Sequence, residues 1–149
     1  MALDLDALLA KAQEMVENAE PELVPVILAG QQVGVRFLPV SGADWRDLAL
    51  KHPPRSDVMR DLNVGYNIDA LVADYPNVAL VDGDSVDDMV REDSEGKKVS
   101  KWPAVWGALT ATGRKDVSSA LWAAHERTPE RLVVDAGKAS AGSRKKKHS

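Results

Sequence analysis

Apolar residues near the start of the chain recur three or four positions apart, which is the spacing of one face of an α-helix. These positions are Leu5, Leu8, Leu9, Ala12, Met15 and Val16. Asp4 or Asp6 is suited to capping the first turn, and Asn18 and Pro21 mark the end. We expect an amphipathic helix whose apolar stripe either folds back onto its own domain or lies in a groove of a neighbouring copy.

Two alternating runs follow and predict a β-hairpin. Their apolar positions are Val24, Val26 and Leu28 in the first run, and Val33, Val35 and Phe37 in the second. Residues 29–32 are expected to form the loop, with Gly30 able to adopt a positive φ. Pro25 lacks a backbone N–H, so the first strand is expected at a sheet edge. Residues 77–81 are the candidate for a third short strand.

Three short helices are predicted in the middle of the chain. The first begins at the capping pair Ser41 and Asp44 and must end near Lys51, because two prolines follow. The second spans residues 55–62 and is expected to turn Val58, Met59 and Leu62 inward. The third is capped by Asn67 and buries a face made of Ile68, Leu71, Val72 and Tyr75.

Residues 82–98 are the most polar internal segment. We expect residues 85–90 to form one or two helical turns and residues 93–98 to form an exposed loop. Beyond this segment the helical spacing returns, with Trp102, Val105, Trp106 and Leu109 on one face. Thr112 and Gly113 are expected to break the chain before a last helix with the apolar stripe Val117, Ala120, Leu121 and Ala124. Pro129 then ends or kinks that helix, and residues 132–134 are a candidate apolar anchor.

The large side chains of this second half have two interpretations. Trp102 and Trp106 lie one turn apart, and Trp122 widens the apolar face of the following helix. The favoured interpretation is a core cluster between two antiparallel helices. The alternative is that some of these rings are exposed anchors for a partner, because tryptophan is enriched at binding hot spots.

These elements together predict an α+β fold. It has an N-terminal helix, a β-hairpin with a candidate third strand, and a mainly helical C-terminal half. A chain of 149 residues with 44% hydrophobic residues is long enough for one domain with its own core. We therefore expect a single globular domain over residues 1–136, followed by a disordered tail over residues 137–149.

Charge separates this tail from the rest of the chain. The tail has five basic residues and no acidic one, so it carries +5. Since the net charge of the whole chain is −4, residues 1–136 carry −9. An acidic body repels phosphates, and we therefore expect neither nucleic acid nor a membrane as partner. The basic tail is either a solvated end or a contact for such a surface or an acidic protein. We expect neither a secretory signal nor a membrane span.

No motif in the chain indicates catalysis, a metal or a cofactor. Cysteine is absent, which excludes thiolate chemistry and disulfides and fits a reducing compartment. Asp82, Asp84, Asp87 and Asp88 do not fit a calcium loop, because its sixth position needs glycine and holds Asp87. His125 has no second histidine four positions away, so a helix-end role is expected. No phosphate-binding glycine loop or nucleophile elbow occurs, so we expect a protein that is not an enzyme.

The order of the elements and some short sequence stretches resemble those of the tail assembly chaperones of phages and prophages of actinobacteria. The likeness rests on residues 25–37, Pro-Val-Ile-Leu-Ala-Gly-Gln-Gln-Val-Gly-Val-Arg-Phe, followed by Pro-Val-Ser-Gly-Ala-Asp-Trp. Residues 101–106 and 120–125 are similar to the helical second half of that family. The resemblance extends from about Val24 to Arg131 and involves no catalytic motif.

The resemblance implies a function and partners. Such chaperones bind the long tape measure protein in the host cytoplasm, keep it soluble, and are displaced by the tail tube protein. They are not expected in the mature virion. A programmed frameshift near the end of the gene usually adds a longer product, and the three lysines at 145–147 fit a slippery coding run. The present chain would then be the short product. Whether it also associates with itself is left open by the resemblance.

The partner-binding candidates are Leu5, Leu8, Leu9, Trp102, Trp106 and Trp122. The alternative from another class is a structural virion component, namely a head–tail connector or tail terminator. A third interpretation, a small enzyme or metal-dependent hydrolase, would need a clustered acid–base or metal site, and the sequence offers only an acidic loop for it.

Overall fold

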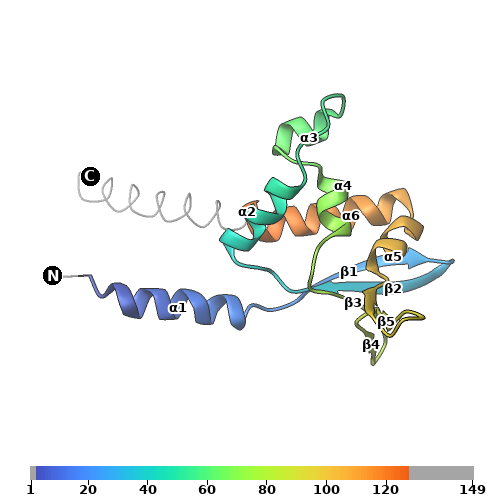
Figure 1. Cartoon of the computed structure of the whole chain (residues 1–149), viewed down its shortest axis with the longest axis horizontal. Coiled ribbons are helices and arrows are strands. Elements are labelled where there is room, and N and C mark those ends of the chain that lie inside the picture. The colour runs from blue at the N-terminus through green and yellow to red at the C-terminus, as the bar shows by residue number, and fades with distance from the viewer. Residues whose placement is uncertain (1–2, 128–149) are drawn as a thin grey trace, which may run out of the picture.

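The computed structural model describes residues 3–127. It contains an antiparallel sheet in which β1 (Glu22–Leu28), β2 (Gln31–Phe37), β3 (Val78–Asp82) and β4 (Ser85–Asp87) follow one another in space (Figure 1). The predicted hairpin and third strand are therefore confirmed, and Pro25 does lie on an edge strand. The hairpin turn consists of Ala29 and Gly30, both with positive φ, and is two residues shorter than expected.

Helix α1 (Leu5–Glu17) precedes the sheet and extends away from it (Figure 1). The Asp4 carboxylate caps it by accepting a hydrogen bond from the Ala7 backbone N–H at 3.1 Å. The Asn18 N–H donates to the Glu14 carbonyl at its other end. The predicted helix, its cap and its end are confirmed. The sequence had left open whether its apolar stripe packs on its own domain or on a neighbouring copy.

Three helices connect β2 to β3: α2 (Gly42–Lys51), α3 (Met59–Val64) and α4 (Ile68–Ala73). Ser41 caps α2 and Asn67 caps α4, each through a side-chain oxygen that accepts a backbone N–H three residues later. α4 buries the expected residues Ile68, Leu71 and Val72, and α2 buries Trp45 and Leu48.

The prediction of which side chains α3 buries was wrong. Met59 and Leu62 are exposed, and the side chain that α3 buries is the carboxylate of Asp61. Burial of Asp61 is possible because Arg55 lies beside it and neutralises its charge. The helix is also shorter than residues 55–62 suggested and begins only at Met59.

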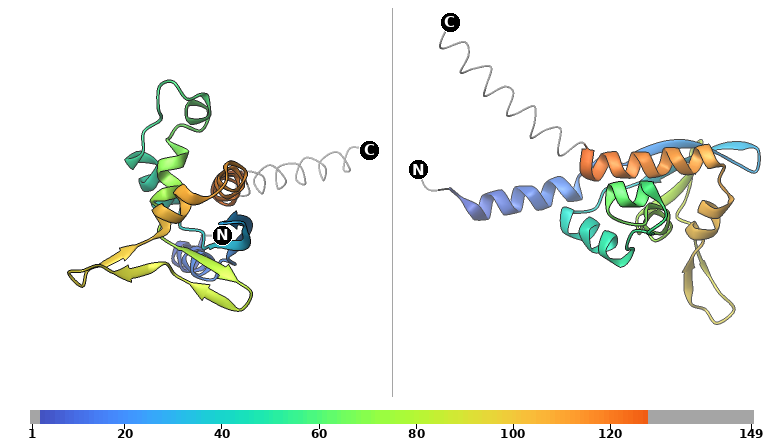
Figure 2. Two further views of the ribbon diagram at one scale, coloured as in Figure 1. Left: turned by 90° about the vertical axis from the view of Figure 1, so that its right-hand side faces the viewer. Right: turned by 90° about the horizontal axis from the view of Figure 1, so that it is seen from above.

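The polar segment after β3 forms strands, so the expected helical turns at residues 85–90 are not present. β4 is followed by a separate hairpin of β5 (Val90–Glu92) and β6 (Lys98–Ser100), which projects from the body (Figure 2). Met89 at the bend has φ 64° and a buried side chain. The Asp87 carboxylate accepts a hydrogen bond from the Met89 N–H at 2.7 Å. This bond stabilises the bend, which would not occur in a continuous helix.

The last elements of the described residues are α5 (Trp102–Ala108), α6 (Ala111–Trp122) and a π-helical turn, η1 (Ala123–Arg127). The break between the helices falls at Leu109 and Thr110, and the expected break at residues 112–113 is wrong. The Thr110 hydroxyl accepts the Gly113 N–H at 3.0 Å and so caps α6. Gly113 lies inside the first turn, where an added Cβ would stand 3.5 Å from the Val26 side chain of β1.

The core lies between one face of the sheet and the helices α2, α4, α5 and α6. Its sheet side consists of Val24, Val26, Val35 and Phe37. Its helix side is formed by Trp45, Leu48, Ile68, Leu71, Val72, Trp102, Trp106, Leu109, Val117 and Leu121. The fold class is therefore α+β as predicted. The expected domain end at 136, the apolar residues 132–134, Pro129 and the basic tail lie outside the described residues.

Candidate partner-binding surface

The apolar stripe of α1 lies in solvent. Leu5, Leu8 and Leu9 are 59%, 48% and 59% exposed, and no residue of α1 is buried. A separate helix of 13 residues is only marginally stable in water, because its hydrogen bonds barely offset the cost of ordering the backbone. A contiguous exposed apolar stripe of this kind marks an interaction site. α1 is therefore a helix that gains stability when another surface covers it.

The tryptophan candidates do not join this stripe. Trp102 and Trp106 are buried with their ring centroids 5.9 Å apart, and the Trp102 indole N–H donates to the Val72 carbonyl at 2.7 Å. Both rings thus belong to the core, as the favoured interpretation held. Trp122 is half-buried and lines a hollow of about 210 Å³ together with Arg60, Val64, Ile68 and Ser119.

A second uncovered apolar surface is the outer face of the sheet, meaning the face opposite the core. Side chains alternate between the faces of a strand, and the cross-strand pairing places Leu23 beside Arg36 and Ala79, and Pro25 beside Gly34 and Val81. Leu23, Ile27 and Val86 are 58%, 43% and 51% exposed on this face. No helix among residues 3–127 packs over it.

Two hollows indent the outer face. One of about 410 Å³ is lined by Leu23, Pro25, Gln32, Gly34 and Val81, among others. The other, of about 260 Å³, is lined by Arg36, Leu38, Ala79 and Val90, among others. A Cβ at Gly34 would stand 2.7 Å from Leu23 Cδ1, so the leucine side chain lies directly over the glycine. The face is therefore apolar and indented where β1, β2 and β3 meet.

The sequence contains a signal for this face that the alternation analysis missed. In β1, Glu-Leu-Val-Pro-Val-Ile-Leu, the positions between the core valines are also apolar. Strands covered on one face only alternate apolar and polar residues, whereas strands covered on both faces show continuous apolar runs. The run therefore indicates that something covers the outer face as well.

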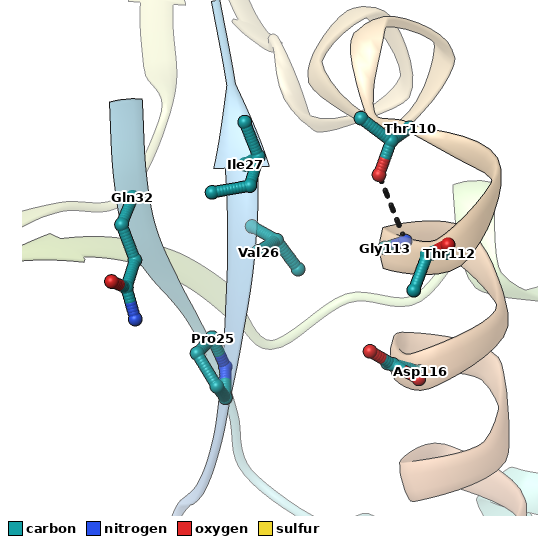
Figure 3. A pocket seen from close by; sticks show the side chains of 8 residues that line it. All are labelled: Pro25, Val26, Ile27, Gln32, Thr110, Thr112, Gly113 and Asp116. Atoms are coloured by element: carbon teal, nitrogen blue, oxygen red, sulfur yellow. Dashed lines mark hydrogen bonds between the residues drawn. The ribbon is translucent and has the colours of Figure 1, made fainter. Parts of the chain in front are cut away.

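A third hollow, of about 160 Å³, lies between β1 and the start of α6 (Figure 3). Pro25, Ile27 and Gln32 line its sheet side, and Thr110 and Asp116 line its helix side. The Thr110 hydroxyl is engaged as the cap of α6. Small-molecule sites usually have about 300–1,000 Å³, so this hollow is too small for a ligand of that class.

The charged pair of highest burial is structural. Arg55 donates to both carboxylate oxygens of Asp61, at 2.7 and 3.1 Å, and its backbone N–H donates to the same group. These hydrogen bonds lower the pKa of the Asp61 carboxyl and raise the pKa of the Arg55 guanidinium. Asp69 accepts a further bond from Arg55 at 3.0 Å. The cluster fixes the loop before α3 and faces no hollow described above.

His125 belongs to an aromatic cluster that attaches η1 to the body. Its ring stacks on Trp45 at a centroid distance of 4.1 Å. The Val40 N–H donates to Nε2 at 3.0 Å, so Nε2 is unprotonated and Nδ1–H donates to the Leu121 carbonyl at 2.8 Å. Burial lowers the pKa of His125 and raises that of the nearby Tyr75 hydroxyl. The histidine lies at the helix end as expected, and it acts there as a neutral packing group.

Two aspartates of residues 82–88 make separate side-chain contacts. Asp82 accepts a hydrogen bond from the Gln31 side chain at 2.8 Å, and Asp87 pairs with Arg91 at 2.6 Å. In the part of the chain that the structure describes, no group of three or more His, Asp or Glu side chains could hold a metal ion. None of the helices within residues 3–127 is both long and apolar enough to span a bilayer.

The two uncovered apolar surfaces, α1 and the outer sheet face, are thus the candidate binding surfaces of residues 3–127. No family model, curated protein or solved structure matches the chain. Of the six candidate residues, the structure places Leu5, Leu8 and Leu9 together on an exposed surface. It places the three tryptophans elsewhere.

Proposed function

We propose that this protein is a tail assembly chaperone that binds the tape measure protein and keeps it soluble while a long phage tail assembles. The observation that carries the proposal is the exposed stripe of α1, which presents Leu5, Leu8 and Leu9 on a helix without an intramolecular partner among the described residues. Such a helix fits another amphipathic helix or a groove in a partner. The resemblance of the sequence to tail assembly chaperones names that partner.

The size of the stripe fits reversible binding. Full burial of a leucine is worth about 1.5–3 kcal/mol, and these three are already about half covered. Their remaining gain is therefore a few kcal/mol, which the loss of rotational and translational freedom largely offsets. One copy would bind weakly, and many copies along one tape measure protein would bind well. Weak single contacts let the tail tube protein displace the coat.

The proposal extends to the other partners and to location. A longer frameshift product would share the N-terminal part, so it would carry the same α1 stripe. The protein would act in the host cytoplasm, would leave before the virion is complete, and would catalyse no reaction. Residues 1–136 are acidic and repel phosphates, so neither nucleic acid nor a membrane is assigned as a partner.

The test is co-expression of the protein with the tape measure protein of the same phage. We expect the two to co-purify and the tape measure protein to stay in solution. Replacing Leu5, Leu8 and Leu9 by glutamine should lower its recovered amount at least tenfold. The matched control replaces Leu50, Met59 and Leu62, which are 68%, 69% and 50% exposed on α2 and α3, and should bind normally. Equal recovery with both triple variants would contradict the assigned surface.

The uncovered sheet face favours one second candidate, a head–tail connector or tail terminator built permanently into a ring. Obligate subunit interfaces are apolar, and the face around Leu23 and Ile27 has that character. Mass spectrometry of finished particles separates the two candidates. A connector is present in the virion in fixed copy number, whereas a chaperone is absent.

A further inference from the structure

We propose that α1 of one copy docks on the outer sheet face of a second copy. Both surfaces are apolar and uncovered within residues 3–127, and every chain carries one of each. Each copy can donate one helix and receive one, either reciprocally in a two-fold dimer or head-to-tail along a series of copies.

The two surfaces agree in length. α1 has 13 residues and is about 20 Å long at 1.5 Å per residue. β1 has seven residues and is about 23 Å long at 3.3 Å per residue. One helix, about 10 Å across, also matches the width of about two strand spacings from β1 to β3. A single α1 therefore covers the uncovered area without a large remainder.

The shapes are complementary in kind. The α1 stripe consists of protruding leucines and a methionine, and the outer face offers two hollows. The Leu23 side chain covers Gly34 and Ala79 is buried, so a docked helix would meet mainly the exposed side chains of Leu23 and Ile27. Large side chains that pack into hollows are the usual basis of apolar packing at interfaces.

The outer face offers one positive charge, beside two aspartates: Asp82 lines one hollow and Asp88 lines the other. Arg36 is the one charged side chain among the outward-facing positions of β1, β2 and β3. The helix with its cap carries Asp4, Asp6, Glu14 and Glu17 against Lys11, a net charge of −3. An acidic side chain from either end of a docked helix could pair with Arg36, so charge favours a contact at the arginine without fixing the direction of the helix.

The chain direction favours a second copy over the helix's own sheet. α1 ends at Glu17 and β1 begins at Glu22, so a docked helix would have to reverse direction within four residues that include Pro21. Figures 1 and 2 show α1 extending outward from the sheet instead. In this orientation the stripe is presented to a neighbour.

The docking uses the α1 stripe on which the proposed function also rests, so a neighbouring copy and a tape measure helix would compete for it. The two proposals nevertheless fail separately. Docking is measured on the purified protein without any tape measure protein, whereas chaperone binding is measured by co-purification.

The experiment measures mass in solution by sedimentation over a concentration series. We expect the weight-average mass of the full chain to at least double as concentration rises. The helix variant replaces Leu5, Leu8 and Leu9 by glutamine, and the face variant is Leu23→Glu. Each alone should stay monomeric, because it lacks one of the two surfaces. Mixed together they should form a 1:1 dimer that grows no further, since one intact helix and one intact face remain.

The control variant with Leu50, Met59 and Leu62 replaced by glutamine should assemble like the unmodified chain. Circular dichroism checks that each variant is folded, and Ile27→Gln on the same face replaces Leu23→Glu if the latter unfolds. An unmodified chain that stays monomeric throughout would overturn the proposal and indicate that α1 folds back on its own sheet. Assembly of the helix variant, or a mixture without dimers, would overturn it as well.

Discussion

Single side chains in this protein show how a charge can be buried without a functional site. The Asp61 side chain has no exposed surface, yet it accepts three hydrogen bonds from Arg55. A buried carboxylate is tolerated when its hydrogen bonds and counter-charge replace the water that it has lost. The pair ties the loop after α2 to α3, and its role is therefore to position backbone.

Asp61→Asn tests this role. The amide cannot accept three bonds or balance the guanidinium, so we expect the free energy of unfolding to fall by about 2 kcal/mol. Asp69→Asn is the matched control, because Asp69 binds the same arginine but is half exposed, and it should cost less than about 0.5 kcal/mol. Urea unfolding followed by tryptophan fluorescence measures both. Equal losses for the two variants would contradict the argument.

The neutral His125 makes stability depend on pH. Its pKa in the folded protein is below the ordinary value of 6.5 because the ring is buried. The unfolded chain therefore binds the proton first as pH falls, and this favours unfolding. The contribution is fully present above about pH 6.5 and is lost as the pH falls through 6.5 towards the lower folded value.

We expect the urea midpoint to decrease between pH 7.5 and 5.5. His125→Phe keeps an aromatic ring beside Trp45 but has no nitrogen, so it should lower stability at pH 7.5 and flatten the change with pH. The control His52→Gln, on the surface at the end of α2, should retain the change. An unaltered pH profile in His125→Phe would assign the effect to other groups.

At the level of secondary structure, tight turns decide where strands end. Ala29 and Gly30 connect β1 to β2 with φ values of 52° and 78°. A two-residue hairpin turn with both φ values positive matches the twist of the strands, and Asn-Gly is its preferred sequence. Alanine at the first position is thus strained, because its Cβ approaches the following carbonyl in this conformation.

Ala29→Asn should stabilise the protein by about 0.5–1 kcal/mol, since asparagine tolerates the left-handed region. Gly30→Ala should destabilise it by about 1 kcal/mol through backbone strain alone, because no atom lies near the added methyl group. Thermal unfolding of both variants measures these changes. Shifts of the same sign would show that the turn has another geometry in solution.

At the scale of the whole molecule, residues 3–127 form a packed body and one helix, α1, that adds nothing to the core. Residues 22–127 supply every buried hydrophobic side chain among the described residues. Cutting α1 away should therefore leave the body intact. This division also explains why the protein can use α1 for binding without losing its fold.

A chain that begins at residue 18 should unfold with a free energy within about 0.5 kcal/mol of the full chain, as for other exposed changes. The measurement is made at a concentration where the full chain is monomeric. Leu121→Ala, at a fully buried position of α6, shows the sensitivity of the assay and should cost about 3 kcal/mol. A loss above 1 kcal/mol on removing α1 would show that the helix packs on its own body.

Local sequence patterns were sufficient to predict an element when one of its faces is uniformly buried or uniformly exposed to solvent. The stripe of α1, the alternation of Val24 and Val26, and the capping residues Ser41 and Asn67 each depend on neighbours within four positions. The elements that they predict are therefore present, and so is the exposed candidate site at Leu5, Leu8 and Leu9. The partner named from the resemblance stays a prediction.

The tertiary structure decided what depends on residues far apart in the chain. Arg55 allows α3 to bury Asp61 instead of Met59 and Leu62, and the bend at Met89 turns an expected helix into two strands. The burial of Trp102 depends on the Val72 carbonyl, 30 positions away. The uncovered outer face likewise depends on which side of the sheet the helices occupy. Periodicity shows that a side chain has an apolar neighbour, but only packing selects which one.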